Sequence, residues 1–283
     1  MGGLQVRRVL TATPLARQHE RRVAGRPQRR PKEIPWAAFD RGKYPSSALS
    51  LACDAQTKLA LGEYGAVDLF SHLASAMALN GVPFDLVAEA TRVPADEIRH
   101  ADIALRMAGL FGGRDVTITI DRQGLRKRWR NDVAMEDLDV LVVDVAAIGE
   151  TLACALLTAC FERATDPTVR ALLGTIVADE VHHARLGWYY LAWRSPQWTR
   201  AERQRVADRI GELVVSIERR FWRGRDAPAS GRSAARALGV LESVGQRAAV
   251  RAVMEDEIVP ALDAIGLGMS HAWRIRQRGS ARG

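Results

Sequence analysis

The sequence predicts an all-α protein: a four-helix bundle with one long crossover, two additional C-terminal helices and an irregular basic N-terminal arm. Three observations lead to this fold class. Residues 47–195 are rich in Ala and Leu, and breaks that contain Gly or Pro divide most of them into long helical segments. One stretch near the middle lacks helical periodicity. A nearly identical seven-residue sequence also occurs twice, once on each side of that stretch.

Residues 1–46 form the predicted basic arm. They contain eleven Lys and Arg against three Asp and Glu, and their Arg- and Pro-rich composition shows little apolar periodicity. We expect an irregular path whose end is pinned to the body by Pro35, Trp36 and Phe39. The tail, residues 268–283, adds four Arg and no acid, so the body between arm and tail is slightly acidic. A nucleic-acid partner is therefore not expected.

The first helical hairpin is expected between Ser47 and Phe111. Its first helix ends at Asn80, where the sequence Asn-Gly-Val-Pro favours a turn, and its second helix ends at a pair of glycines. Pro94 lies inside the second helix. Because proline lacks an N–H and clashes with the preceding turn, we expect it to kink or restart that helix.

Residues 112–135 form the predicted crossover. The sequence DVTITID alternates with period two and is followed by the basic sequence RQGLRKRWR, which predicts a small β-hairpin. Helical sequence resumes at Met135, breaks at Thr165-Asp166-Pro167 and continues to Arg194. These two segments give the second helical hairpin of the domain at 47–195.

Residues 196–267 are predicted to form two extra helices packed on the bundle. They are expected near 198–223 and 231–265, separated by a patch rich in Gly, Pro and Ser. The basic tail follows them.

The repeated sequence occurs as ADEIRHA in the first hairpin and as ADEVHHA in the second. Glu97 precedes His100 by three residues, and Glu180 precedes His183 by the same spacing. Each helix therefore carries one carboxylate and one imidazole on the same face. One such pair alone is more often a solvated surface pair than a site, so the neighbouring residues decide the interpretation.

Two further glutamates complete the set. Glu63 and Glu150 each follow a glycine on the first helix of a hairpin, about as far before the turn as the repeated sequence lies after it. Both lie on apolar stripes, where a carboxylate is costly to bury unless it is paired or bound to a metal. Four Glu and two His predict a metal site. This ligand set suits two iron or manganese ions better than a tetrahedral zinc ion.

With these residues the chain resembles the ferritin-like di-iron carboxylate proteins, whose bundles use a Glu from two helices and a Glu-x-x-His from the other two. The resemblance covers about residues 48–195. It implies two iron ions, with manganese and iron together as the alternative, and O₂ as co-substrate. The implied ligands are Glu63 and His100 for one metal, Glu150 and His183 for the other, and Glu97 and Glu180 as bridges.

The first copy of the repeat also resembles the D-E-x-R-H element of bacterial multicomponent monooxygenase hydroxylases. The second copy departs from it, because His182 stands where Arg would be. This resemblance suggests that each Asp reaches the His of the opposite copy, with Asp96 near His183 and Asp179 near His100. A metal-bound His usually donates its other ring N–H to a carboxylate. The alternative is a surface ion pair with an arginine of the same helix.

Other relatives differ from this chain in specific ways. Rubrerythrins usually add a domain with Cys-x-x-Cys pairs, and ferritins and bacterioferritins are shorter. The p-aminobenzoate N-oxygenase group carries a further His where this chain has Ile176. N-oxygenation therefore lacks the support of that ligand.

The leading interpretation is an O₂-dependent, non-heme di-iron oxidase or oxygenase. It would act on a small organic substrate by hydroxylation, N-oxygenation or desaturation, and an electron-donor reductase would supply the electrons for the reaction. The alternative is a ferroxidase or iron-handling protein without an organic substrate, and a ferritin-like interaction module is the third reading. No catalytic side chain is assigned. Tyr64 and Tyr190 are candidate redox tyrosines, whereas Cys154 is interpreted as a small core residue.

Location and assembly are also expected from the sequence. Three cysteines suit reduced thiols in a cytoplasm better than a disulfide framework. No window of 18 residues is both apolar and free of charge, so no membrane partner is expected. The long arm and the extra helices favour a monomer or a homodimer over a cage.

Overall fold

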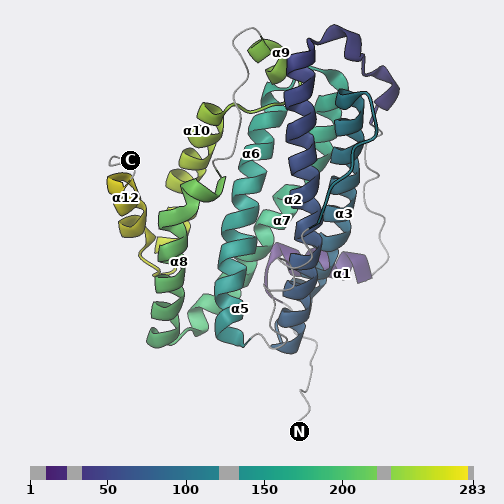
Figure 1. Cartoon of the computed structure of the whole chain (residues 1–283). Coiled ribbons are helices and arrows are strands. Elements are labelled where there is room, and N and C mark those ends of the chain that lie inside the picture. The colour runs from purple at the N-terminus through teal and green to yellow at the C-terminus, as the bar shows by residue number, and fades with distance from the viewer. Residues whose placement is uncertain (1–10, 24–33, 121–133, 222–230, 280–283) are drawn as a thin grey trace.

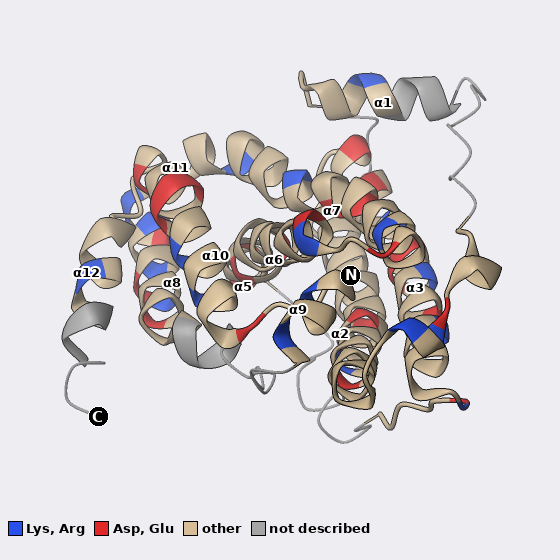
Figure 2. Ribbon diagram, turned by 90° about the horizontal axis from the view of Figure 1, so that it is seen from above, with Lys and Arg blue, Asp and Glu red and all other residues tan. Residues whose placement is uncertain are grey.

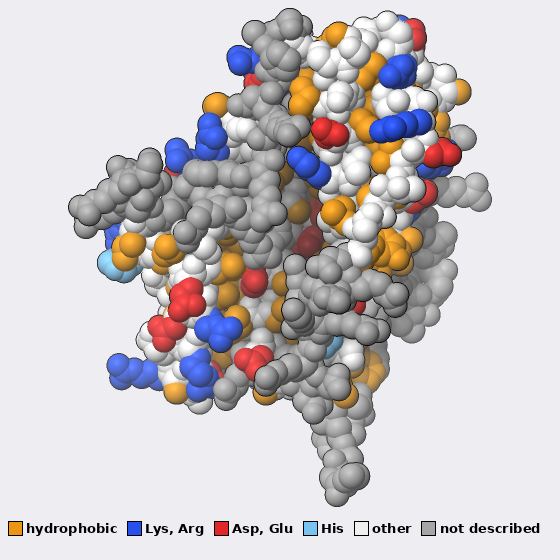
Figure 3. Space-filling model, viewed as in Figure 1, with side chains coloured by type: hydrophobic (Ala, Val, Ile, Leu, Met, Phe, Trp, Pro, Cys, Tyr) orange, Lys and Arg blue, Asp and Glu red, His pale blue; other side chains and the backbone are white. Residues whose placement is uncertain are grey.

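The computed structural model describes residues 11–23, 34–120, 134–221 and 231–279. Within these ranges every element of secondary structure is a helix, so the all-α class is confirmed. The long helices lie side by side in Figure 1. Basic and acidic side chains are interspersed over the face shown in Figure 3, which agrees with the small net charge of the body.

The first hairpin consists of α2 (Ser46–Leu79) and α3 (Phe84–Gly112), in good agreement with the sequence expectation. Gly81 in the turn has a φ of 68°, a left-handed conformation that favours glycine. The expectation that Pro94 restarts the helix is wrong, because α3 continues through it. Proline removes only one N–H from a 29-residue helix, and buried neighbours such as Val93 hold both halves in the core.

The second hairpin begins with three consecutive helical segments and returns through one long helix. Asp166 caps the returning helix by accepting hydrogen bonds from the backbone N–H groups of Thr168 and Val169, at 2.9 and 3.1 Å. One of the first three segments is a π-helix that ends directly before Glu150. Such wide turns are rare and are frequent at functional sites. In order, the segments are α5 (Met135–Leu141), the π-helix η3 (Val142–Gly149), α6 (Glu150–Arg163) and α7 (Pro167–Arg194).

The described part of the crossover contains no strand, although its alternating sequence predicted one. Residues 114–120 are described and have no strand. The remainder of the expected hairpin, residues 121–133, lies outside the described residues. Alternation over so few residues specifies a strand only when a partner strand pairs with it.

The segment 137–163 is long and apolar enough to cross a membrane, with a mean hydropathy of 2.1 over its most apolar window. Of that window, 56% is buried inside the protein. The segment packs against α7 and carries Glu150, so it serves as a core helix of this fold.

The expectation of an irregular arm is wrong for one part of it, because residues Pro14–Val23 form helix α1. Pro14 at the first helical position is pre-organised for a helix, and the buried side chain of Leu15 anchors it. The backbone N–H and the hydroxyl of Thr11 donate hydrogen bonds to the buried carboxylate of Asp85 at the start of α3. This contact ties the arm to the body.

The end of the arm packs as the sequence predicted. The ring of Phe39 lies 5.3 Å from that of Phe111, and the guanidinium of Arg106 lies 4.2 Å from the centre of a Trp36 ring. Two short 3₁₀ turns, η1 (Trp36–Ala38) and η2 (Arg41–Lys43), carry this segment.

The C-terminal part differs from the two long helices that were predicted. The helix expected over 231–265 is interrupted at Gly239, which has a φ of 73°. The expected tail instead contains a helix that packs on α8, with Trp273 buried. The C-terminal helices are α8 (Arg200–Phe221), α9 (Arg232–Ala237), α10 (Ser243–Val253), the π-helix η6 (Met254–Ile258), α11 (Val259–Ala264) and α12 (Met269–Gly279). Figure 2 shows α6 and α7 between the α2–α3 pair and helices α8 and α12, whereas α9 packs against α2.

Candidate metal centre

A buried group of two carboxylates and two imidazoles lies where α3 meets α7. Glu97 and His100 come from α3, and Glu180 and His183 come from α7, each pair on one helical face because of its i, i+3 spacing. One potential ligand atom from each residue lies within 4.8 Å of all the others. All four side chains are at most 1% exposed. This group can hold a metal ion.

The closest contacts in this group run between the helices. His100 Nδ1 lies 3.1 Å from Glu180 Oε1, and His183 Nδ1 lies 3.1 Å from Glu97 Oε1. Within each helix the histidine is farther from its own glutamate, at 3.7 Å on α3 and 3.6 Å on α7. Each carboxylate therefore lies near both imidazoles.

Several of these facing atoms lack a hydrogen-bond partner. Glu97 Oε2, His100 Nδ1, Glu180 Oε1 and His183 Nδ1 are all buried, and none has a partner of good hydrogen-bond geometry. Buried polar atoms are normally satisfied, so each such atom requires an explanation. Atoms that converge without hydrogen bonding to one another are arranged as metal ligands are.

The other ring nitrogen of each histidine faces an aspartate of the opposite helix. His100 Nε2 lies 3.2 Å from Asp179 Oδ2, and His183 Nε2 lies 3.4 Å from Asp96 Oδ2. The crosswise pairing expected from the repeated sequence is confirmed. Each aspartate can accept the ring N–H and so leave Nδ1 free to bind a metal.

Two arginines of α3 lie over these aspartates. Arg99 contacts Asp179 across the helix pair and lies 3.5 Å from Asp96. Arg92 lies 3.2 Å from Asp96. The surface ion pair considered as an alternative for Asp96 is thus present together with its contact to the histidine. Arg92 was not among the residues expected at the site, although its i, i+4 spacing to Asp96 is a signal for such a pair.

The remaining two glutamates lie at the edge of the group. Glu150 is 9% exposed, and its Oε2 lies 3.8 Å from His183 Nδ1. Glu63 is partly buried, and its carboxyl interacts with that of Glu97. Neither belongs to the tight cluster of four.

The four carboxyl groups separate into two electrostatic classes. Burial raises the pKa of Glu63 and Glu150 well above the usual range, and the nearby carboxylates of Glu97 and Glu180 raise it further. Burial also acts to raise the pKa of Glu97 and Glu180. There the contacts with the two histidines outweigh it and lower the pKa instead. The protonated form is thus favoured at Glu63 and Glu150, and the ionised form at Glu97 and Glu180.

Both histidines are held in the charged form. Burial acts to lower the pKa of His100, but the carboxylates of Asp179, Glu180 and Glu97 outweigh it and raise that pKa to about 11. The pKa of His183 is raised against burial in the same way, with Asp96 as the main partner. Each imidazole therefore lies between a glutamate and an aspartate of the opposite helix.

The other residues singled out from the sequence have different settings. Tyr64, next to Glu63, is 44% exposed, whereas Tyr190 is fully buried. Burial raises the pKa of Cys154, and the charge of Glu180 raises it further, so this thiol stays protonated.

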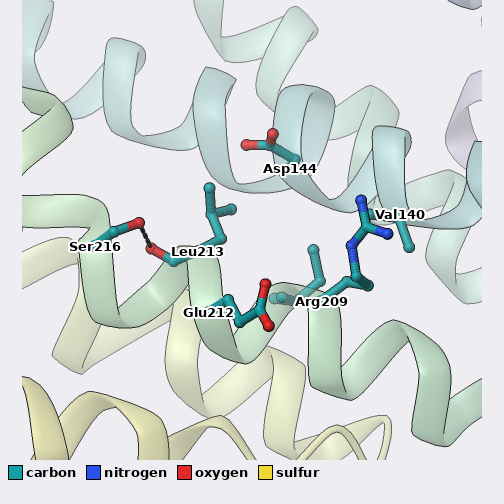
Figure 4. A pocket seen from close by; sticks show the side chains of 7 residues that line it. Val140, Asp144, Arg209, Glu212, Leu213 and Ser216 are labelled. Atoms are coloured by element: carbon teal, nitrogen blue, oxygen red, sulfur yellow. Dashed lines mark hydrogen bonds between the residues drawn. The ribbon is translucent and has the colours of Figure 1, made fainter.

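A separate pocket of about 300 Å³ lies between α8 and the segment formed by α5 and η3 (Figure 4). No sequence pattern predicted it. Its side chains mix apolar groups with charges of both signs, and Asp144 belongs to the π-helix that precedes Glu150. The lining residues are Val140, Asp144, Arg209, Ile210, Glu212, Leu213 and Ser216.

Comparison with models of known protein families gives no match. Comparisons with curated proteins and with solved structures give no match either. The geometry of the buried group is therefore what supports a function for this chain.

Proposed function

We propose that the chain is a ferritin-like four-helix protein that binds two iron ions and uses O₂ to oxidise a small organic molecule. The observation that carries this proposal is the buried convergence of two Glu-x-x-His pairs, each histidine backed by an aspartate. Two such pairs on facing helices are the ligand pattern of di-iron carboxylate bundles. The proposed ligands are Glu63, Glu97, His100, Glu150, Glu180 and His183.

The distances support different roles for these ligands, as bridging or as terminal carboxylates. Glu97 and Glu180 each lie within 3.7 Å of both histidines, as bridging carboxylates would. Glu150 Oε2 lies 3.8 Å from His183 Nδ1, which supports one metal ion between these two residues. The charge of His100 acts to lower the pKa of Glu63, which supports the second metal ion between His100 and Glu63. Oxygen and imidazole ligands without thiolate favour iron or manganese.

Iron held by the proposed ligands would supply electrons to O₂, and the chain's own residues would provide the surroundings of the metal. The fully buried cluster excludes bulk water from the ligands. Asp96 and Asp179 hold the imidazole rings in one orientation, and Arg99 holds both aspartates together. The reaction also needs an external electron donor, for which we propose a reductase.

Replacing Asp179 by asparagine is expected to weaken metal affinity about 10- to 100-fold while the fold survives. Asparagine keeps the size of the side chain but removes the charge that orients and polarises the His100 ring. Metal dissociation constants and far-UV circular dichroism check this result. Replacing the exposed Asp54 of α2, in the first hairpin, by asparagine is the control. Equal affinities for both variants would contradict the role given to Asp179.

Metal loading is expected to release on the order of four protons per two metal ions. Before loading, the raised pKa values of Glu63, Glu150 and His183 favour the protonated forms of these groups. The pKa of His100 is raised to about 11, so its proton must be displaced across the neutral range. Because protons are products, affinity should increase as the pH rises and fall as the pH is lowered.

Calorimetric titration in two buffers with different ionisation enthalpies measures this proton release. Release of fewer than about one proton would contradict the protonation states assigned to the group.

The function is tested by loading the protein with Fe(II) without oxygen and then adding O₂. Elemental analysis is expected to give about two irons per chain, and Mössbauer spectra should show a coupled ferric pair. Iron that accumulates far beyond this ratio as an oxide would favour the iron-handling alternative. Failure of the protein to bind iron at these residues would overturn the proposal.

A further inference from the structure

A second buried polar group lies on the same face of α7 as the candidate ligands. Tyr190 follows His183 by seven residues, which is two helical turns, or roughly 10 Å along the axis. Its side chain is fully buried, and its hydroxyl donates a hydrogen bond of 2.7 Å to Asp139 Oδ1. The side chain of Asp139 is fully buried as well.

The carboxylate of Asp139 has further partners besides Tyr190. Its Oδ2 accepts a hydrogen bond of 2.8 Å from Trp198 and lies 3.2 Å from Arg194 Nη2. Burial raises the pKa of Asp139, although these partners and Tyr190 oppose the shift. Burial also raises the pKa of Tyr190, so its phenol stays protonated and can lose an electron easily only if the proton leaves too.

The aromatic contacts continue from Tyr190 towards the surface. The ring centres of Tyr190 and Trp193 are 5.6 Å apart in an edge-to-face arrangement, and Trp193 is only partly buried. Tyr64 has a different setting, because it is 44% exposed. The structure thus distinguishes the two tyrosines that the sequence had offered as redox candidates.

We propose that Tyr190 and Trp193 form a one-electron relay between the candidate metal centre and the protein surface, with Asp139 as the proton acceptor. This inference rests on the proposed function. With iron held by the proposed ligands, O₂ would be the oxidant, and one of the electrons that reduce it would come from Tyr190. The phenolic O–H bond breaks, the proton moves to Asp139 Oδ1, and a neutral tyrosyl radical remains. An electron from Trp193 and the return of the proton from Asp139 restore the tyrosine, and a one-electron reductant at the surface, of the ascorbate or reduced iron–sulfur class, restores Trp193.

The first test needs no metal. Azide radicals oxidise tryptophan side chains of the apo-protein, and absorption then follows transfer of the electron hole from tryptophan to tyrosine. We expect Tyr190→Phe and Trp193→Phe to remove the fastest phase of tyrosyl formation. The control Tyr189→Phe, its immediate neighbour on α7, should leave that phase unchanged. Equal kinetics in the Tyr189 and Tyr190 variants would overturn the relay.

A second variant tests the relay even if the Tyr190→Phe protein does not fold normally. The chain has only four tyrosines, so replacing Tyr44, Tyr64 and Tyr189 by phenylalanine leaves Tyr190 alone. Any tyrosyl signal in this protein comes from Tyr190. We expect the fast phase to persist there, and its loss would contradict the proposal.

The third measurement uses the iron-loaded protein. Electron paramagnetic resonance after rapid freezing should detect a radical when O₂ is added without a reductant, and its hyperfine pattern should narrow with ring-deuterated tyrosine. Tyr190→Phe should lose this signal and Tyr189→Phe should keep it. Iron oxidation without a radical on Tyr190 would overturn the relay alone. Absence of iron oxidation would overturn the proposed function, and the apo-protein measurement would still decide the relay.

Discussion

Replacing Glu63 and Glu150 together by alanine is expected to abolish the binding of two metal ions while the helical fold survives. The remaining cluster on α3 and α7 offers two carboxylates and two imidazoles, which cannot complete the coordination of two ions. The pKa values of both glutamates are raised, which favours their neutral forms. Their removal is therefore expected to leave the charge balance around the two ion-paired histidines largely unchanged.

Elemental analysis measures the number of bound metal ions, and thermal unfolding measures whether the helical fold survives. A control variant replaces Asp54 of α2 and Glu162 of α6, which are exposed carboxylates on the same two helices, by alanine. It should bind two metal ions as the unmodified protein does. Two tightly bound ions in the Glu63 and Glu150 variant would show that the ligand assignment is wrong.

Replacing Gly187 by alanine is expected to destabilise the protein by about 3 kcal/mol, because the new methyl group would overpack the core. A Cβ at this position would overlap with the backbone of Ala146 and Ala147 in the π-helix η3. Backbone atoms cannot rotate away as a side chain can, so α7 and η3 must separate. Since η3 ends directly before Glu150, metal affinity should fall as well.

Urea denaturation and metal titration test this prediction against a matched glycine. Gly62 lies inside α2 and has open space at its Cβ position. Gly62→Ala should stabilise the protein by about 0.5–1 kcal/mol through the lower entropy of the unfolded chain. A Gly187→Ala protein as stable as Gly62→Ala would contradict the close approach of α7 to η3.

Much of the site follows from local rules of helix geometry that can be applied to the sequence alone. The i, i+3 spacing places Glu97 with His100, and Glu180 with His183, on one face of each helix. The positions of the turns at Gly81 and Asp166 set the level of each pair within its hairpin. Helix periodicity and rise are nearly constant, so faces and levels could be predicted without coordinates.

Other expectations failed where local preference competes with packing. The alternating residues before Asp121 favour a strand, yet the described part has none, because a strand needs a partner for its backbone groups. The arm was expected to be irregular, yet the side chain of Leu15 is buried and the backbone N–H of Thr11 donates a hydrogen bond to Asp85. A charged segment with few apolar residues can still fold where one of them meets an open part of the core.

The sequence by itself determined the all-α class, the helical hairpins and the four residues of the buried cluster, Glu97, His100, Glu180 and His183. Only the tertiary structure decided how these residues meet. It showed that each histidine lies closest to the glutamate of the other helix, that Arg99 joins both aspartates, and that Tyr190 rather than Tyr64 is buried against a carboxylate. Helical periodicity is a property of neighbours along the chain, whereas these contacts depend on the relative rotation and spacing of helices far apart in the sequence. Side-chain packing between those helices sets that geometry, and no local pattern records it.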